Sequence, residues 1–251
     1  MFKVTIKPKS SYITNLSSST IFGAACWAIL ELYGEDVLNE VFKDNNALAF
    51  SNAFIKDCIP TGCTKKDNLK NVKTGKEIKQ KQEKHRVDHC MINRDTNISH
   101  KQWISYEQFE TRELDIYVSS ILFGLDEIKE IFELMLIKGI GQARNRGKGQ
   151  FELVSIQEIK TEELGDKDGN GYMVISDYIP NEKDSTWGKY SARVINRITV
   201  DGRKCAPVYV INAGSKFIGK ISGEVIGKLQ YDKNTGTYLS GRAIAIPIRV
   251  S

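Results

Sequence analysis

The spacing of hydrophobic and polar residues predicts alternating strands and helices in the first part of the chain. A period of two indicates strands, and a period near 3.6 indicates helices with one apolar side. The predicted order, with a short second helix and an insertion, resembles the β-α-β-β-α-β order of a ferredoxin-like unit. The elements are Phe2–Ile6, Ile21–Tyr33 ending at Gly34, a short helix at Glu35–Phe42, Ala47–Ile55, Leu114–Ser120, Asp126–Ile137 and Phe151–Ile156.

A lysine-rich insertion interrupts this order. Pro60–Gln82 contains few apolar residues, which predicts an exposed and mobile segment. His85–Thr96 and Trp103–Phe109 flank a short polar break, and we expect them to form a hairpin-like projection that carries Arg86, Arg94 and Lys101. The insertion spans about residues 57–105.

The second part of the chain has a different pattern. Short strand-like segments alternate with turns after about Phe151, which suggests a degenerate, β-rich partner of the first part. The candidate strands are Tyr172–Asp177, Val208–Asn212, Phe217–Ser222 and Ala243–Val250.

The segment between the second long helix and the strand that follows it, Gly139–Phe151, carries the most chemistry. It contains four glycines, Gly139, Gly141, Gly147 and Gly149, and the cations Arg144, Arg146 and Lys148, with no acidic residue. Glycine lets backbone N–H groups approach a polyanion closely, and arginine grips phosphate or stacks on a base. The segment lacks the P-loop pattern and follows a helix instead of opening one. A solvated basic turn is the alternative reading.

Two further regions suit an RNA ligand. Ser17, Ser18, Ser19 and Thr20 precede the first long helix, where unpaired N–H groups favour an anion. Simple helix capping is the alternative for these hydroxyls. His89 and Arg94 lie on the predicted projection and could wedge into or stack on RNA, although a solvated hairpin explains them equally well. Trp27 and Phe22 lie on an apolar helix, and we expect both in the core.

Charge is unevenly distributed along a chain with a net charge of +5. Lys56–Lys101 has 12 Lys and Arg against 6 Asp and Glu, whereas Tyr106–Met135 has 2 against 8. Separate basic and acidic faces are therefore expected, one of them for a polyanion. Glu127, Glu130 and Glu133 are weaker candidates for a surface that faces a protein partner.

Several function classes are disfavoured. No apolar run reaches the roughly 18 residues of a spanning helix, and the first six residues alternate like a strand, so we expect a cytoplasmic protein without membrane contact. Five cysteines do not suggest a disulfide framework. Zinc binding by Cys58, Cys63, His85 and His89 stays a minor hypothesis, because a long spacer separates the pairs. No convincing catalytic set is present, although His85 and His100 are candidate acid–base groups.

These residues together resemble a known family, the RAMP proteins of type III CRISPR effector complexes. The nearest likeness is to the fourth subunit of the type III-A (Csm) complexes, which caps the 5′ handle of the crRNA. The similarity lies in Leu16–Ile29, the basic element His89–Thr96, the glycine-rich segment, Trp187–Tyr190, Ala206–Phe217 and Gly241–Pro247.

The resemblance implies an α+β protein of two ferredoxin-like (RRM-like) domains at residues 1–150 and 151–251, the second degenerate and β-rich, with a basic thumb-like insertion. It implies a non-catalytic subunit without cofactor or metal. The implied partners are the crRNA 5′ handle, the large polymerase-like Csm subunit, the adjacent backbone RAMP subunit and, indirectly, target RNA. A RAMP-type endoribonuclease that processes precursor crRNA is the alternative. The implied RNA-binding residues are Ser17, Ser18, Ser19, Thr20, His89, Arg94, Gly139, Gly141, Arg144, Arg146, Gly147, Lys148 and Gly149.

Overall fold

The fold combines α-helices with antiparallel sheets. The computed structural model describes residues 1–63, 68–79, 84–93, 95–96, 99–108, 110–184, 187–196, 206–219, 221, 223–226 and 239–250. Every strand pairing in these residues is antiparallel. The α+β class that the sequence predicts is therefore confirmed.

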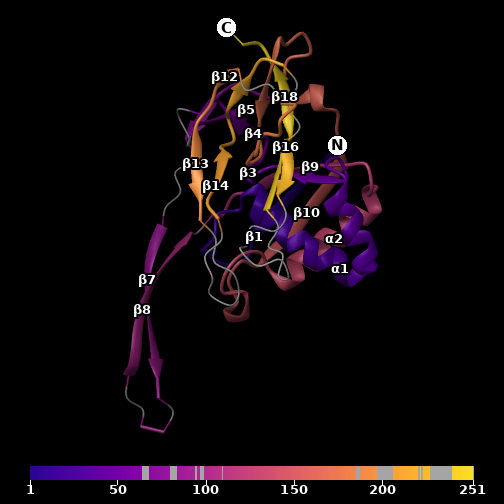
Figure 1. Ribbon diagram of the computed structural model, residues 1–251. Coiled ribbons are helices and arrows are strands. Elements are labelled where there is room, and N and C mark those ends of the chain that lie inside the picture. The colour runs from indigo at the N-terminus through magenta and orange to yellow at the C-terminus, as the bar shows by residue number, and fades with distance from the viewer. Residues whose placement is uncertain are drawn as a thin grey trace.

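The first sheet has the predicted ferredoxin-like order. Its strands are arranged β10-β1-β9-β2, and β3 also pairs with β9. Helices α1 and α2 pack against this sheet around a buried core in which Phe50 contacts both Phe22 and Phe132 (Figure 1). The bounds are β1 Phe2–Pro8, α1 Ser18–Lys43, β2 Leu48–Phe50, β3 Phe54–Ile55, β9 Leu114–Ser120, α2 Leu125–Lys138 and β10 Phe151–Glu158.

The structure bears on two boundaries that the sequence suggests, one at Gly34 and one between residues 150 and 151. Gly34 lies inside α1 with φ 86°, which kinks the helix where the sequence predicts a stop. Strand β10 begins at the proposed boundary between residues 150 and 151, yet it pairs with β1 along its length. The first sheet therefore extends to Glu158.

The described part of the insertion forms two separate structures, a small sheet and a hairpin. Strands β4 (Cys58–Pro60), β5 (Asn68–Asn71) and β6 (Glu77–Lys79) form a small sheet, in which Leu69 is only 1% exposed. The described part of Pro60–Gln82 is mostly exposed or half-buried, in line with the expected exposure, but it contains paired strands and the buried Leu69, which the sequence did not predict. Leu69 and the half-buried Ile78 pack against a core that includes Tyr117, which attaches this sheet to the body.

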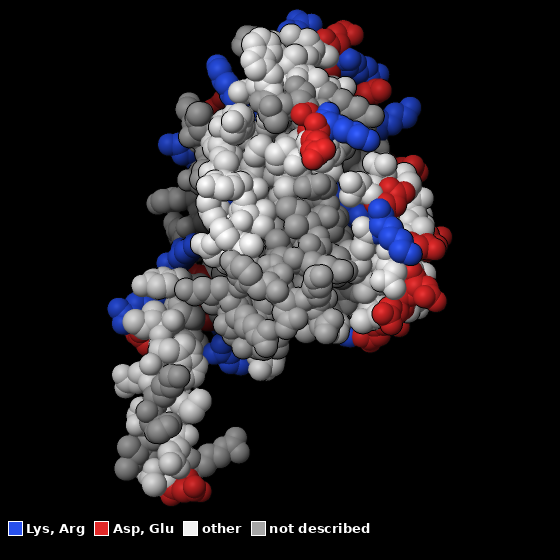
Figure 2. All heavy atoms as spheres, in the orientation of Figure 1, with Lys and Arg blue, Asp and Glu red and all other residues white. Residues whose placement is uncertain are grey.

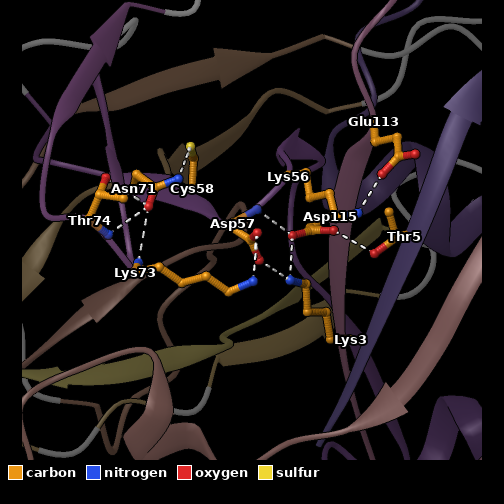
Figure 3. Close-up of polar contacts among 10 residues, drawn as sticks. All are labelled: Lys3, Thr5, Lys56, Asp57, Cys58, Asn71, Lys73, Thr74, Glu113 and Asp115. Atoms are coloured by element: carbon orange, nitrogen blue, oxygen red, sulfur yellow. Dashed lines mark hydrogen bonds and ion pairs between the residues drawn. The ribbon is translucent and has the colours of Figure 1, made fainter.

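A buried charge cluster also joins the small sheet to the first sheet. Lys3 Nζ on β1 lies 2.5 Å from Asp57 and 2.9 Å from Asp115, and Asp115 also accepts a hydrogen bond from Thr5 (Figure 3). Asp57 accepts a further contact from Lys73 in the turn after β5. Burial opposes charge on Asp57, but these lysines outweigh it and lower the pKa of that carboxyl.

The second part of the insertion projects from the body as predicted. Strands β7 (Lys84–Ile92) and β8 (Ser99–Gln108) form a long two-stranded hairpin that extends away from the sheets (Figure 1). Among the described residues of the insertion, this hairpin is the part that projects like a thumb.

The second half of the chain is β-rich, as predicted. Within its described residues from 159 onward there is one short 3-10 helix, η2 (Thr161–Glu163), and no α-helix. A ferredoxin-like order for this half stays a prediction. Its strands are β11 Gly171–Val174, β12 Gly188–Lys189, β13 Ala192–Ile195, β14 Val208–Ile211, β15 Lys216–Phe217, β16 Gly223–Ile226, β17 Leu239–Arg242 and β18 Ala245–Ile248.

Arg242 connects the two halves. Its guanidinium is buried and donates to the backbone oxygens of Val41, Asp44 and Leu48, at the end of α1 and the start of β2. These carbonyls replace the water that a guanidinium loses on burial. Neither α1 nor α2 is long and apolar enough to cross a bilayer, a finding that covers the described residues.

Candidate nucleic-acid interface

The glycine-rich loop has a defined backbone. Gly139 ends α2 with φ 77°, and a short 3-10 helix, η1 (Arg144–Arg146), lies between Ala143 and Gly147, both left-handed. Gly149 is the most constrained position, because a Cβ there would meet Ile140 O at 2.1 Å. Ile140 N–H donates to Gly149 O across the base of the loop. The loop is thus a closed turn that presents η1 at its tip.

Three of the glycine amides that we expected to face RNA donate within the protein instead. Gly139 N–H bonds to Leu136 O, Gly147 N–H to Arg144 O, and Gly149 N–H to Ser11 O. The glycines therefore shape the loop, and its side chains are left to contact a ligand.

The two loop arginines are exposed, and one of them reaches the hairpin. Arg144 and Arg146 are exposed on η1. The Arg146 guanidinium carbon lies 5.8 Å from the centre of the Trp103 ring on β8, and Trp103 stacks on His89 of β7 at 5.1 Å and 12°. His89 and Trp103 are directly paired across the hairpin. A cation and two aromatic rings thus form one layered surface where the loop meets the hairpin.

Lys148 has a different environment from the arginines. Its ammonium lies 2.7 Å from Glu107 Oε2 and 3.0 Å from Ser11 Oγ. Glu107 is fully buried; that burial opposes its charge, yet the hydrogen bonds from Lys148 and Ser11 outweigh it and lower the pKa of the carboxyl. Lys148, predicted to contact phosphate, therefore has a structural partner at the root of the hairpin.

His89 is part of the same network. Its Nε2 lies 2.6 Å from Ser105 Oγ, and Ser105 donates to Glu107 at 3.4 Å. Glu107 thus joins the glycine-rich loop, through Lys148, to both strands of the hairpin.

The segment after β1 connects these features to α1. Tyr12 pairs with Gln108 at the end of β8, and Gln142 N–H donates to Thr14 Oγ1. Asn15 Oδ1 accepts a hydrogen bond from the Gln108 amide. The loop, the hairpin root and the start of α1 therefore meet along Tyr12–Asn15.

The four hydroxyl residues at the start of α1 are not equivalent. Ser18 is buried, its N–H donates to Asn52, and its hydroxyl accepts from Asp177 N–H. Ser17, Ser19 and Thr20 are half-buried. The Ser17 hydroxyl oxygen lies 3.2 Å from that of Ser19 and 3.1 Å from that of Thr20. Ser18 thus connects the two halves of the chain, and the others stay candidates for contact with a ligand.

Two further predictions concern Arg94 and a possible zinc site. Arg94 lies outside the described residues. Cys58 and Cys63 are buried in the body, away from His89 on the hairpin, and no group of three or more His, Cys, Asp and Glu in the described residues is placed to hold a metal ion. The zinc hypothesis gains no support from this geometry.

The prediction that Phe22 and Trp27 both lie in the core is right for one residue and wrong for the other. Phe22 is buried, as expected, but Trp27 is 63% exposed on α1, which contradicts its prediction as core. Trp103 and Glu107 were missed as site residues. The signal was present, because Trp103, Ser105 and Glu107 alternate along β8 and therefore share one face of the hairpin.

Comparison with known proteins agrees with the predicted fold. No protein-family model matches the chain, and no curated protein matches it. A chain of the crystal structure of the Csm3–Csm4 subcomplex of the type III-A CRISPR-Cas interference complex is similar, with 17% identity, a TM-score of 0.64, and coverage of 98% of this chain and 99% of that chain. A chain of the Csm1–Csm4 cassette in complex with cA4 is similar at 14% identity and a TM-score of 0.63, over 100% and 99% of the two chains.

A third similarity extends to another type of complex. A chain of the type III-B Cmr-beta complex, bound to cognate target RNA and AMPPnP, has 12% identity and a TM-score of 0.53 over 86% of each chain. Csm4 is the component that the first two structures share. The chain therefore has, over its whole length, the fold found in type III CRISPR effector complexes, as the sequence resemblance predicted.

Proposed function

We propose that this chain is a non-catalytic, RNA-binding subunit of a type III-A CRISPR effector complex that holds the 5′ handle of the crRNA. The observation that carries the proposal is the pair Arg144 and Arg146, which are exposed on a closed loop beside a projecting hairpin. Arginines fixed on such a loop suit the phosphates of a single strand, and the Trp103–His89 stack suits its bases. The full-length similarity to chains of Csm4-containing structures supports this assignment.

The same proposal includes two protein partners. Similar chains occur in structures with Csm1 and with Csm3, so we propose that this chain bridges a large polymerase-like subunit and a backbone subunit. Figure 2 shows acidic side chains gathered over the flank formed by α1 and α2, on the side away from the hairpin. That flank also exposes Trp27 and Ile137, a combination that suits a protein surface better than RNA.

The proposal assigns no bond-making step to this chain. RNA cleavage without a metal needs a base held beside the 2′-hydroxyl. His89 on β7 stacks on Trp103 and bonds to Ser105, which suits a positioning role.

Nuclease protection of the crRNA 5′ end in the purified complex tests the proposal. We expect the handle to be protected in the wild-type complex and to become accessible in an Arg144→Ala/Arg146→Ala variant. Lys160→Ala/Lys167→Ala removes the same charge at exposed sites beyond the opposite end of β10 from the loop and serves as the control. A handle that stays protected in the arginine variant would contradict the proposal.

A further inference from the structure

A cleft of about 660 Å³ lies between the start of α1, the root of the hairpin and the second half of the chain. Its lining includes Thr14 and Asn15 from the segment before α1, and Arg193 of β13 and Asn212 from the second half of the chain. Thr14 accepts the Gln142 N–H and Asn15 accepts from Gln108, so the cleft continues directly from the glycine-rich loop. Its volume falls within the range that small ligands occupy.

The lining of the cleft is mixed in character. It combines apolar Phe54, Leu69 and Pro60 with the polar side chains of Asn15, Asn52 and Arg193. Apolar surface together with amide and guanidinium groups is the combination that holds an unstacked nucleobase, which stacks by its face and hydrogen-bonds by its edge.

The polar groups of the lining are held rigidly. Asp177 is buried, accepts from Asn52 Nδ2 at 3.3 Å, and pairs with Arg193 at 2.5 Å. Arg193 also donates to Asn212, which is held in turn by Ser191. The Arg193 side chain stays 41% exposed, and each of its two terminal nitrogens, which make one of these contacts apiece, keeps a second N–H. Lys84, exposed at the start of β7, adds a second cation to the lining.

We infer that this cleft receives one splayed nucleobase of the bound single-stranded RNA, with Lys84 and Arg193 beside the adjoining phosphates. The inference rests on the proposed function and adds to it a defined subsite for a base, separate from the phosphate contacts of the glycine-rich loop.

An abasic scan tests the subsite. A single-stranded RNA of about ten nucleotides, within the range of known site sizes, is compared with a series in which each base is removed in turn. One position should lose affinity by about 5- to 150-fold when its base is removed, because a single base–aromatic contact has that effect.

A substitution that fills the cleft identifies the position. Thr20 lines the cleft from the first turn of α1, whereas the exposed Gly23, one turn further along α1, does not, and a Cβ on it would meet no atom within 4 Å. Thr20→Phe should weaken the intact RNA to the level of the sensitive abasic RNA and remove the difference between them. Gly23→Phe is the control and should keep that difference.

Asn15→Ala provides a test that does not fill the cleft, because Asn15 is exposed and, among the described residues, its side chain accepts a hydrogen bond from the Gln108 amide alone. It should reduce the same abasic effect in part. RNA binding with no base-sensitive position, or with an abasic effect equal in all variants, would overturn the subsite and leave the proposed function intact. A wild-type chain that binds no RNA, alone or in its complex, would overturn both.

Discussion

Arg146 on the glycine-rich loop lies over the ring of Trp103 on the hairpin, with its guanidinium carbon 5.8 Å from the ring centre. These residues are far apart in the sequence, and their contact makes the loop and the hairpin one surface. A guanidinium held in this way keeps its outer N–H groups for phosphate. The contact therefore explains how a basic loop and an aromatic hairpin act on the same strand of RNA.

The loop arginines should control the salt dependence of RNA binding. For a single strand the slope of log K against log salt is about −0.7 per phosphate contacted, so Arg144→Ala/Arg146→Ala should reduce its magnitude by about 1.4. Fluorescence anisotropy over a salt series measures this slope. The charge-matched Lys160→Ala/Lys167→Ala variant should keep the wild-type slope, and equal slopes for all three proteins would argue against phosphate contacts at the loop.

Lys148 should matter for stability more than for RNA. Lys148→Ala leaves Glu107 buried without its cation, and such a change costs about 3 kcal/mol in the free energy of unfolding. Lys148→Met combined with Glu107→Gln removes both charges and should lose less. Urea unfolding compares the variants. A Lys148→Ala protein as stable as wild type would show that Lys148 is free to bind RNA after all.

Two glycines of the loop should respond differently to the same substitution. A Cβ on Gly149 would meet Ile140 O at 2.1 Å, whereas a Cβ on Gly147 has no atom within 4 Å; both have positive φ. Gly147→Ala should therefore lower the free energy of unfolding by only about 1 to 2 kcal/mol, which is the cost of holding alanine in the left-handed conformation. Gly149→Ala should cost more and should also weaken RNA binding. Equal losses of stability in urea would contradict the closed form of the loop.

Stability should fall in acid because of two carboxyls. The pKa values of Asp57 and Glu107 are lowered in the folded protein, since their lysine contacts outweigh burial. Their contribution is fully present above the unfolded pKa values of about 4 and is lost as the pH falls through the lower folded values. Urea unfolding from pH 7 to pH 3 should show a shallower decline in an Asp57→Asn/Glu107→Gln protein. An unchanged decline would contradict the role of these two groups.

The sequence predicted elements best where a single periodicity or a glycine decided them. The ferredoxin-like order, the break at Gly34 and the hairpin all followed from local patterns. The small sheet did not, because β5 and β6 are short and polar and carry one apolar residue each, Leu69 and Ile78. The polar average composition of the segment gives no sign that two apolar residues, one on each strand, would be paired and packed against the body.

The sequence predicted which loop forms the candidate site, but not which of its basic residues are free for a ligand and which have a structural partner. Arg146 and Lys148 are two residues apart and equally basic, yet one faces a ring and the other a buried carboxylate. Only tertiary contacts separate them, since Trp103 and Glu107 come from a distant strand. Trp27 failed for a related reason, because α1 carries apolar residues around much of its circumference and its outward side cannot be read from spacing.

The most direct test of the account is crosslinking of crRNA to this chain in the purified complex, with the sites mapped by mass spectrometry. We predict that nucleotides of the 5′ handle crosslink to the Arg144–Arg146 segment and to Trp103 or His89 on the hairpin. Handle crosslinks confined to the acidic flank of α1 and α2, or none to this chain, would contradict it.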